Sequence, residues 1–225
     1  MRLGVMGGTF NPIHYGHLAA ANEVGEAFAL DTVVFVPAAV PPHKELAEII
    51  DPRHRLMMAI MATIAHPQFA VSSVEIDRPG ASYTVDTVVQ LKHLYQGQKS
   101  IYFIVGIDAF VDIATWRQPD VLLESCHIIV TSRPGYNVHD LVPSTLRQVS
   151  ERHPHLTFEP LADRPPRNRR GFQVRETPYR IYVQEVSGLD ISSTELRQRV
   201  KARRSIRYLL PDSVDAYIQK YQLYH

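Results

Sequence analysis

The stretch that decides the fold of this chain is Gly7-Gly8-Thr9-Phe10-Asn11-Pro12-Ile13-His14-Tyr15-Gly16-His17. An apolar run, residues 3–6, precedes it, and the small apolar residues 18–21 follow it, which predicts a strand, a turn and a helix. Glycine lets the backbone come close to a ligand, and the N–H groups that open a helix attract anions. In an open α/β sheet, such a turn lies at the carboxyl end of a strand, where ligands bind. The stretch therefore predicts a phosphate site.

Two histidines lie within this stretch. His14 and His17 are three residues apart, so both lie on one face if the helix begins near Pro12 or Ile13. Two imidazoles can then reach one phosphate group. A His-x-x-His pair by itself is more often an ordinary feature of a helix start, and two glycines after a strand are a weak signal. The whole string is more specific than either part.

Strand-like runs alternate with helical patterns along most of the chain. This alternation predicts an α/β fold, a Rossmann-like doubly wound parallel sheet with a small C-terminal helical appendage. Right-handed crossovers bring the loops after Met6, Val36 and Val105 to one edge of the sheet. The predicted strands are residues 3–6, 32–36, 69–74, 101–105, 128–131 and 181–183, and the predicted helices are residues 18–28, 53–65, 85–95 and a short one around 121–123.

The last part of the chain has two helix-start signals. Ser192 and Glu195 have capping-box spacing, which predicts Ser192 as the N-cap of a helix that opens with residues 191–197. Pro211 is typical of a helix start and predicts a final helix. We therefore expect a core, residues 1–190, and a helical part, residues 191–225, that completes the same domain.

Composition limits the possible functions. A chain of 225 residues with 45% hydrophobic residues suits one α/β domain with an appendage. The formal net charge of +1 argues against a global preference for nucleic acid or membrane. Cys126 is the single cysteine and is expected in the core, so a disulfide framework and a cysteine zinc site are excluded.

The sequence also bears on location. The first predicted strand begins almost at once, with no apolar stretch of signal-peptide length, so we expect a cytoplasmic protein. The longest uncharged run, residues 56–74, nearly reaches membrane-spanning length. Because His66-Pro67-Gln68 divides this run into a helix and a strand, we expect no membrane association.

Residues 160–179 break the alternation, because prolines and arginines stand there among few apolar residues. Such a composition is typical of an exposed loop, here an arginine-rich insertion near residues 163–179. A solvated loop without a partner is the first interpretation, and a contact with phosphate or nucleic acid is the sharper alternative. The arginines are Arg164, Arg167, Arg169, Arg170 and Arg175.

Lys44 follows the second predicted strand in Pro41-Pro42-His43-Lys44. Paired prolines hold the chain extended, so Lys44 projects from a stiff loop beyond the carboxyl end of a strand. A surface lysine is the default interpretation. The position favours a contact with a β- or γ-phosphate, for which the compact charge of lysine is suited.

Three further segments carry candidate binding groups. Gly106 and Asp108 end a strand where a ribose is often held, although Asp108 could simply cap the next helix. Residues 82–87 open a helix whose N–H groups can receive a carboxylate. Trp116 is the only tryptophan, and such a residue is more often core than a stacking platform. The segment 191–197 offers N–H groups, hydroxyls and an arginine to an anion.

In this order, these motifs resemble the nucleotidylyltransferase superfamily and, within it, the bacterial nicotinate-nucleotide adenylyltransferases. The turn and the late helix start are typical of the superfamily, while residues 82–87 with Trp116 select the pyridine-nucleotide branch. The resemblance runs through nearly the whole chain and leaves out the arginine-rich loop. Asn11 stands where the family usually has aspartate, which removes a charge but keeps a short polar turn-former.

The resemblance implies transfer of AMP from ATP to nicotinate mononucleotide, giving nicotinate adenine dinucleotide and pyrophosphate in NAD biosynthesis. Mg²⁺ would accompany ATP without dedicated protein ligands. The implied catalytic residues are His14, His17, Lys44 and Arg197. The implied ATP contacts are Gly7, Gly8, Thr9, Phe10, His17, Lys44, Gly106, Asp108, Ile191, Ser193, Thr194 and Arg197. The implied mononucleotide contacts are Asn11, His43, Lys44, Tyr83, Thr84 and Trp116, with Trp116 stacked on the pyridine ring.

Two alternatives stay open. Phosphopantetheine adenylyltransferase shares the turn and the late helix start but accepts a different phosphate. A nucleotide sensor or RNA-binding protein on the same fold is an alternative from another class, since fold alone does not decide function. The presence of all the phosphate-facing residues argues against a sensor, which need not keep groups aimed at a leaving pyrophosphate. Oligomeric state is left open.

Overall fold

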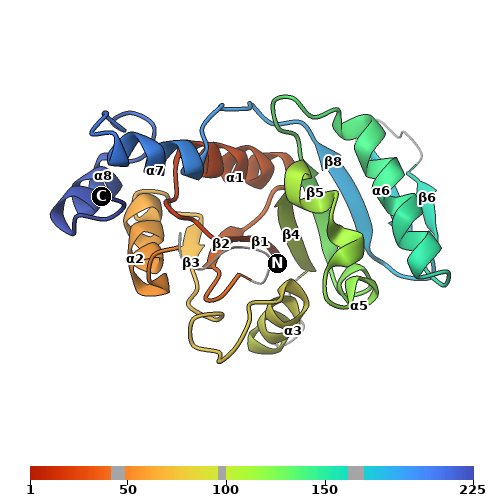
Figure 1. Ribbon diagram of the computed structural model, residues 1–225. Helices are drawn as coiled ribbons and strands as arrows, with labels where there is room; N and C mark the ends of the chain where they lie inside the picture. Colours follow the sequence, from red (N-terminus) through yellow and green to blue (C-terminus); the bar gives the residue numbers. More distant parts are fainter. Residues whose placement is uncertain (42–48, 96–99, 162–169) are drawn as a thin grey trace.

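An eight-stranded sheet runs through the computed structural model, which describes residues 1–41, 49–95, 100–161 and 170–225 (Figure 1). The strand order is β3-β2-β1-β4-β5-β8-β7-β6. The strands are β1 Arg2–Gly8, β2 Thr32–Pro37, β3 Phe69–Val71, β4 Ser100–Gly106, β5 His127–Thr131, β6 Phe158–Pro160, β7 Gly171–Val174 and β8 Arg180–Gln184. The α-helices are α1 Tyr15–Phe28, α2 Pro52–Thr63, α3 Thr84–Leu94, α4 Ile107–Phe110, α5 Pro119–Leu123, α6 Val138–Arg152, α7 Ser193–Lys201 and α8 Asp212–Lys220, and a 3-10 helix covers Ile113–Thr115.

The direction of winding changes at β1. Parallel partners lie on both sides of this strand, β2 with Val5 opposite Val34 and β4 with Val5 opposite Phe103. The chain therefore builds the sheet first toward β3 and then, from β4, toward the other edge. A crevice forms outside the carboxyl ends of the strands at such a switch point, which places the Gly7–His17 turn at its mouth.

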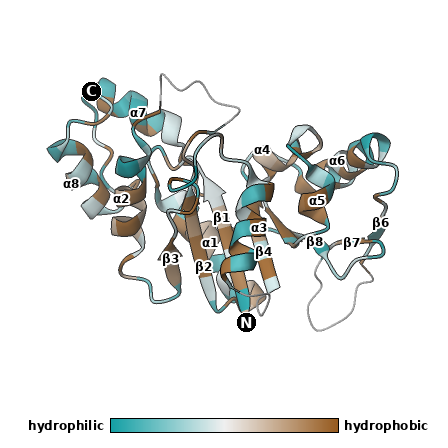
Figure 2. Cartoon of the chain, turned by 90° about the horizontal axis from the view of Figure 1, so that it is seen from below, coloured by the Kyte–Doolittle hydropathy of each residue, from teal (hydrophilic) through white to brown (hydrophobic). Residues whose placement is uncertain are grey.

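Helices cover both faces of the sheet. Alternate residues of β1 enter different cores: Leu3 and Val5 pack with α3, α5 and α6, whereas Met6 packs with α1, α2, α7 and α8. Much of β2 and β4 is hydrophobic, as the brown colour in Figure 2 shows. Strands that are covered on both faces read as nearly continuous apolar runs, which is why the sequence predicts the central strands well. No helix in the described segments is long and apolar enough to cross a membrane.

The predicted doubly wound α/β fold is confirmed, with an antiparallel addition at the edge and a helix, α6, that the sequence does not predict. β6 and β7 are antiparallel to their neighbours, so the sheet is mixed. The predicted strand over residues 69–74 ends earlier, at Val71. The prediction that Cys126 is a core residue is confirmed, and burial raises the pKa of its thiol to about 12.

The prediction of an exposed loop over residues 160–179 is wrong for part of that segment. Gly171–Val174 forms β7, which pairs with β8 in a hairpin, and Val174 is buried. A Cβ atom on Gly171 would lie 2.3 Å from the Ile181 carbonyl oxygen, so only glycine fits where the two strands approach. Arg164, Arg167 and Arg169 lie outside the described residues, whereas Arg175 is described and pairs with Glu159 at 3.6 Å.

Candidate active site

A cavity of about 620 Å³ lies at the carboxyl ends of β1, β4 and β5, large enough for a nucleotide-sized ligand. Residues from the N-terminal ends of α1 and α7 also line it. It brings together nearly all residues for which phosphate or adenosine contacts are expected. The predicted site residues that line it are Gly7, Gly8, Thr9, Phe10, Asn11, His14, His17, Gly106, Asp108, Ile191, Ser193, Thr194 and Arg197.

Helix α1 begins at Tyr15, earlier than the predicted helical run of residues 18–28 but later than a start near Pro12 or Ile13, which was the condition for placing both histidines on one helix face. His14 is therefore the N-cap, in an extended conformation, and not a residue of the helix. The two histidine rings nevertheless lie together, with centroids 3.8 Å apart. The backbone N–H of His14 donates to Nδ1 of His17 over 3.2 Å, so a neutral His17 ring carries its proton on Nε2. His17 thus has the tautomer of a hydrogen-bond donor at Nε2.

His14 is buried beside the cavity. Its Nδ1 atom is a buried side-chain nitrogen for which the described part of the chain supplies no hydrogen-bond partner. Burial, assisted by the charge of Arg133, lowers the pKa of His14 to about 4, so the ring is neutral at pH 7. A buried polar atom without a protein partner suggests that a ligand provides one.

The glycine-rich turn is tightly constrained. Phe10 adopts a φ of 48°, unusual for a residue with a side chain, and its ring meets His17 edge-on at 5.1 Å. A Cβ atom on Gly8 would lie 3.0 Å from the Phe10 ring, so a larger residue there would require this ring to shift. The turn is thus packed from within.

Side chains from distant segments hold the carbonyl groups of this turn. Ser193 Oγ donates to the Pro12 carbonyl over 2.8 Å, and Arg197 Nη1 donates to the Asn11 carbonyl over 3.0 Å. Ser193 and Arg197, which are expected to contact phosphate, therefore also position the turn. Ser192 is the N-cap of α7, as predicted, and its hydroxyl accepts the N–H of Glu195 over 3.1 Å.

Arg55 is a residue that sequence reasoning missed. Its guanidinium is fully buried and donates to three carbonyls, those of Thr9 (2.7 Å), Ala39 (3.1 Å) and Ile50 (3.1 Å). It thereby joins the phosphate turn to the segments on either side of residues 42–48. No local signal in the helix over residues 53–65 distinguishes it, because its partners are remote in sequence.

Asp108 and Arg133 face each other within the cavity. An N–H of Arg133 donates to the Asp108 carboxylate, and both residues line the cavity wall. Arg133 was also missed. It lies just beyond β5, and the loop after a parallel strand lies at the same edge of the sheet as the loops after Met6 and Val105. The carboxylate expected to hold a ribose thus has a cationic neighbour.

Of the residues expected to bind the mononucleotide, Asn11 lines the cavity and the others do not line it or are not described. His43 and Lys44 lie outside the described residues. Tyr83, Thr84 and Trp116 do not line the cavity. Trp116 is partly buried and meets Phe103 edge-on at 6.3 Å. A Cβ atom on Gly7 would lie 3.4 Å from the Phe103 ring, so this ring lies next to both Trp116 and the start of the turn.

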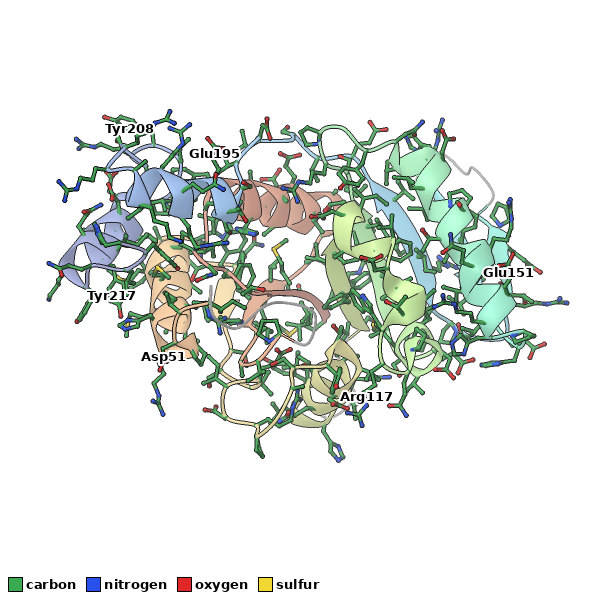
Figure 3. The ribbon with its side chains drawn as sticks, in the orientation of Figure 1. Asp51, Arg117, Glu151, Glu195, Tyr208 and Tyr217 are labelled. Atoms are coloured by element: carbon green, nitrogen blue, oxygen red, sulfur yellow. The ribbon has the colours of Figure 1, made fainter. Side chains whose placement is uncertain are left out.

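Hydrogen bonds also link the N-terminus of α3 to the phosphate turn. Tyr83 is its N-cap, and the Arg117 guanidinium lies 4.7 Å from the Tyr83 ring; Figure 3 shows Arg117 beside α3. The preceding Ser82 hydroxyl accepts the N–H of Ala39 over 2.9 Å. Because Arg55 links Ala39 to Thr9, hydrogen bonds connect the start of α3 with the phosphate turn.

The described residues contain no group of three or more His, Cys, Asp or Glu side chains that could hold a metal ion. Among the predicted cavity-lining residues the only carboxylate is that of Asp108, which is engaged by Arg133. This donor set does not fit a metal cage made by protein groups alone.

The switch-point cavity, with its glycine turn and two helix N-termini, defines a nucleotide-binding α/β protein, and residues 5–199 match the model of the cytidylyltransferase-like family. A protein of Thermoanaerobacter sp. (strain X514), named as a probable nicotinate-nucleotide adenylyltransferase, is 42% identical over 224 residues, covering 100% of this chain and 94% of the relative. A protein of the same name from Moorella thermoacetica (strain ATCC 39073 / JCM 9320) is 43% identical over 223 residues, covering 99% and 91%.

The chain belongs to the nicotinate-nucleotide adenylyltransferases of the cytidylyltransferase-like family, as its motifs predict. The structure of Plasmodium falciparum nicotinic acid mononucleotide adenylyltransferase complexed with NaAD has the same fold, with a TM-score of 0.72, 19% identity and coverage of 99% of this chain and 97% of that chain. The two relatives of 42% and 43% identity favour the nicotinate branch over the phosphopantetheine alternative.

Proposed function

We propose that this protein transfers AMP from ATP to nicotinate mononucleotide, forming nicotinate adenine dinucleotide and pyrophosphate. The observation that carries this proposal is the cavity at the switch point, where His14, His17 and the N-terminus of α7 converge. Its lining includes several hydrogen-bond donors and the cations Arg133 and Arg197, which suits a polyphosphate.

The nucleophile is a phosphate oxygen of the mononucleotide, which is already ionised at neutral pH. It attacks the α-phosphorus of ATP in line, a bond forms between them, and the bond from the α-phosphorus to the bridging oxygen breaks. Pyrophosphate leaves with the electron pair of that bond. The reaction therefore needs alignment and charge stabilisation and no strong general base.

In this reaction His17 donates from Nε2 to a phosphate oxygen, and neutral His14 donates to the same group. Arg197 and Ser193 hold the turn and place the start of α7 against the phosphate tail. Lys44 supplies a charge to the tail, and Gly106 and Asp108 line the adenosine part. Mg²⁺ accompanying ATP would supply countercharge to the phosphates, without dedicated protein ligands.

The mononucleotide occupies the side of the turn near α3. Backbone N–H groups near Thr84 and Trp116 receive the nicotinate carboxylate, and the Trp116 ring stacks on the pyridine ring. Asn11, His43 and Lys44 contact the remainder of the mononucleotide. An amide in place of the carboxylate loses the attraction to a helix N-terminus, so nicotinate is favoured over nicotinamide.

Steady-state pyrophosphate release with ATP tests the proposal. We expect release with nicotinate mononucleotide, much less with nicotinamide mononucleotide, and none with phosphopantetheine. His17→Ala is expected to lower kcat by roughly 10²-fold, because a donor to transition-state charge is lost. His155→Ala is the control, since this histidine is 57% exposed and lies outside the cavity. Equal activity of the His17 and His155 variants would remove the assigned role.

A further inference from the structure

Tyr224 makes a buried hydrogen bond to the phosphate turn from the far end of the chain. Its hydroxyl donates to Oδ1 of Asn11 over 2.9 Å, across a sequence separation of 213 residues. Asn11 is 4% exposed and Tyr224 is 9% exposed, so water does not compete effectively for this bond. Burial raises the pKa of the Tyr224 phenol, which keeps its proton available for donation.

The hydroxyl has a role that packing alone does not explain. The Tyr224 ring belongs to the core on the α1 side of the sheet, where a phenylalanine of the same shape would fill the same space. A buried hydroxyl is costly unless it is hydrogen-bonded, and its acceptor here is a residue that lines the cavity. We therefore attribute the presence of the Tyr224 hydroxyl to its hydrogen bond with the Asn11 side chain.

The bond determines how Asn11 is held. An amide oxygen that accepts from Tyr224 fixes the plane of the carboxamide and places its nitrogen on the opposite side. The main-chain carbonyl of the same residue accepts from Arg197, and the next carbonyl, that of Pro12, accepts from Ser193. Side chain and main chain of Asn11 are thus oriented from two different segments.

We propose that Tyr224 is a positioning residue of the active site: its hydroxyl fixes the Asn11 carboxamide and, through it, the turn that receives the substrate phosphates. The inference deepens the proposed adenylyl transfer and rests on it for its catalytic consequence. Tyr224 itself does not line the cavity, so it acts through Asn11.

The test is a double-mutant cycle of Tyr224→Phe and Asn11→Ala in the full chain. Tyr224→Phe is expected to lower kcat/KM about tenfold while the melting temperature falls by no more than about 4 °C. In the Asn11→Ala background the same substitution is expected to change kcat/KM less than about twofold, because the acceptor is gone. Tyr208→Phe is the matched control, since this tyrosine is 77% exposed and points outward in Figure 3. The inference would be overturned if Tyr224→Phe lowered kcat/KM by the same factor with and without Asn11→Ala. It would also be overturned if the Tyr224→Phe variant were as active as the control.

Calorimetric titration with ATP alone separates this inference from the proposed reaction. Tyr224→Phe is expected to weaken ATP binding about fivefold, and a dissociation constant equal to that of the wild type would overturn the positioning role. If the wild type binds ATP but forms no dinucleotide from nicotinate mononucleotide, the proposed reaction fails. A weakened ATP complex in the variant would still support the role of Tyr224 in holding the turn.

Discussion

Arg133, just beyond β5, donates a hydrogen bond to the carboxylate of Asp108 at the start of α4, so a cation and an anion meet beside the ends of two neighbouring strands. Both side chains are partly exposed, at 45% and 36%, so the pair itself contributes little to stability. Its significance lies in its position on the cavity wall, where a polyanionic substrate would meet the arginine.

Arg133→Ala is therefore expected to raise KM for ATP about tenfold and to shift the melting temperature by less than about 2 °C. Arg175→Ala is the control, because Arg175 also forms an exposed ion pair, with Glu159, but lies outside the cavity. Steady-state kinetics and thermal unfolding measure both effects. A KM for ATP that is equal in the two variants would show that Arg133 does not contribute to nucleotide binding.

His14 predicts a specific pH dependence of stability. Because burial lowers its pKa to about 4, the unfolded chain binds more protons than the folded chain between pH 4 and 6.5. The free energy of unfolding contributed by His14 therefore falls as the pH drops through this window, by about 2 kcal/mol between pH 7 and pH 5. The lowered pKa of His127 acts in the same direction, and the raised pKa of Glu75 acts in the opposite one.

Urea unfolding at pH 7 and pH 5 checks this expectation, because the difference between the two free energies of unfolding can be compared between the wild type and each variant. His14→Gln is expected to lose less stability on acidification than the wild type, while His155→Gln should behave as the wild type does, since that side chain is 57% exposed. An identical loss for wild type and His14→Gln would mean that His14 is not held neutral by the fold.

Trp116→Ala distinguishes a stacking platform from a core residue. Loss of an aromatic platform removes roughly 1–3 kcal/mol of contact, so KM for nicotinate mononucleotide should rise far more than KM for ATP. The contact of Trp116 with Phe103 at 6.3 Å offers the competing explanation. A large fall in melting temperature with equal changes in both KM values would assign Trp116 to the core.

Gly171 gives a test of β7, an inner strand that the sequence does not predict. Gly171→Ala is expected to destabilise the fold by about 2 kcal/mol or more, because the new Cβ would lie 2.3 Å from a carbonyl of β8. Gly25→Ala is the control: its Cβ would lie 3.7 Å from Val33, and alanine stabilises a helix by about 0.5–1 kcal/mol relative to glycine. Deleting residues 164–175 should also destabilise, since it removes β7. If neither Gly171→Ala nor the deletion lowered the melting temperature, β7 would contribute nothing to the stability of the fold.

Local sequence patterns predict the part of the site that is local in sequence. The glycine turn, His14, His17 and the N-cap Ser192 each carry their signal within a few residues, and the structure brings them to one cavity. The central strands were predictable because burial on both faces demands uninterrupted apolar runs.

Long-range contacts explain why Arg55 and Tyr224 were missed. Arg55 and Tyr224 resemble ordinary residues of a helix and of a C-terminal segment, and only folding reveals that they bond to Thr9 and Asn11. Strand β7 was missed because prolines and arginines dominate the composition around it. Its pairing with β8 depends on the close approach at Gly171, which composition does not report.

The bonds to the phosphate turn also set an order of events during synthesis. The turn is made early, but Ser193, Arg197 and Tyr224, which hold it, follow 181, 186 and 213 residues after their partners. Contacts of such separation form late, because the intervening chain must first be ordered. A chain still emerging from the ribosome therefore carries the glycine turn without these three supports until nearly all of these residues have been added.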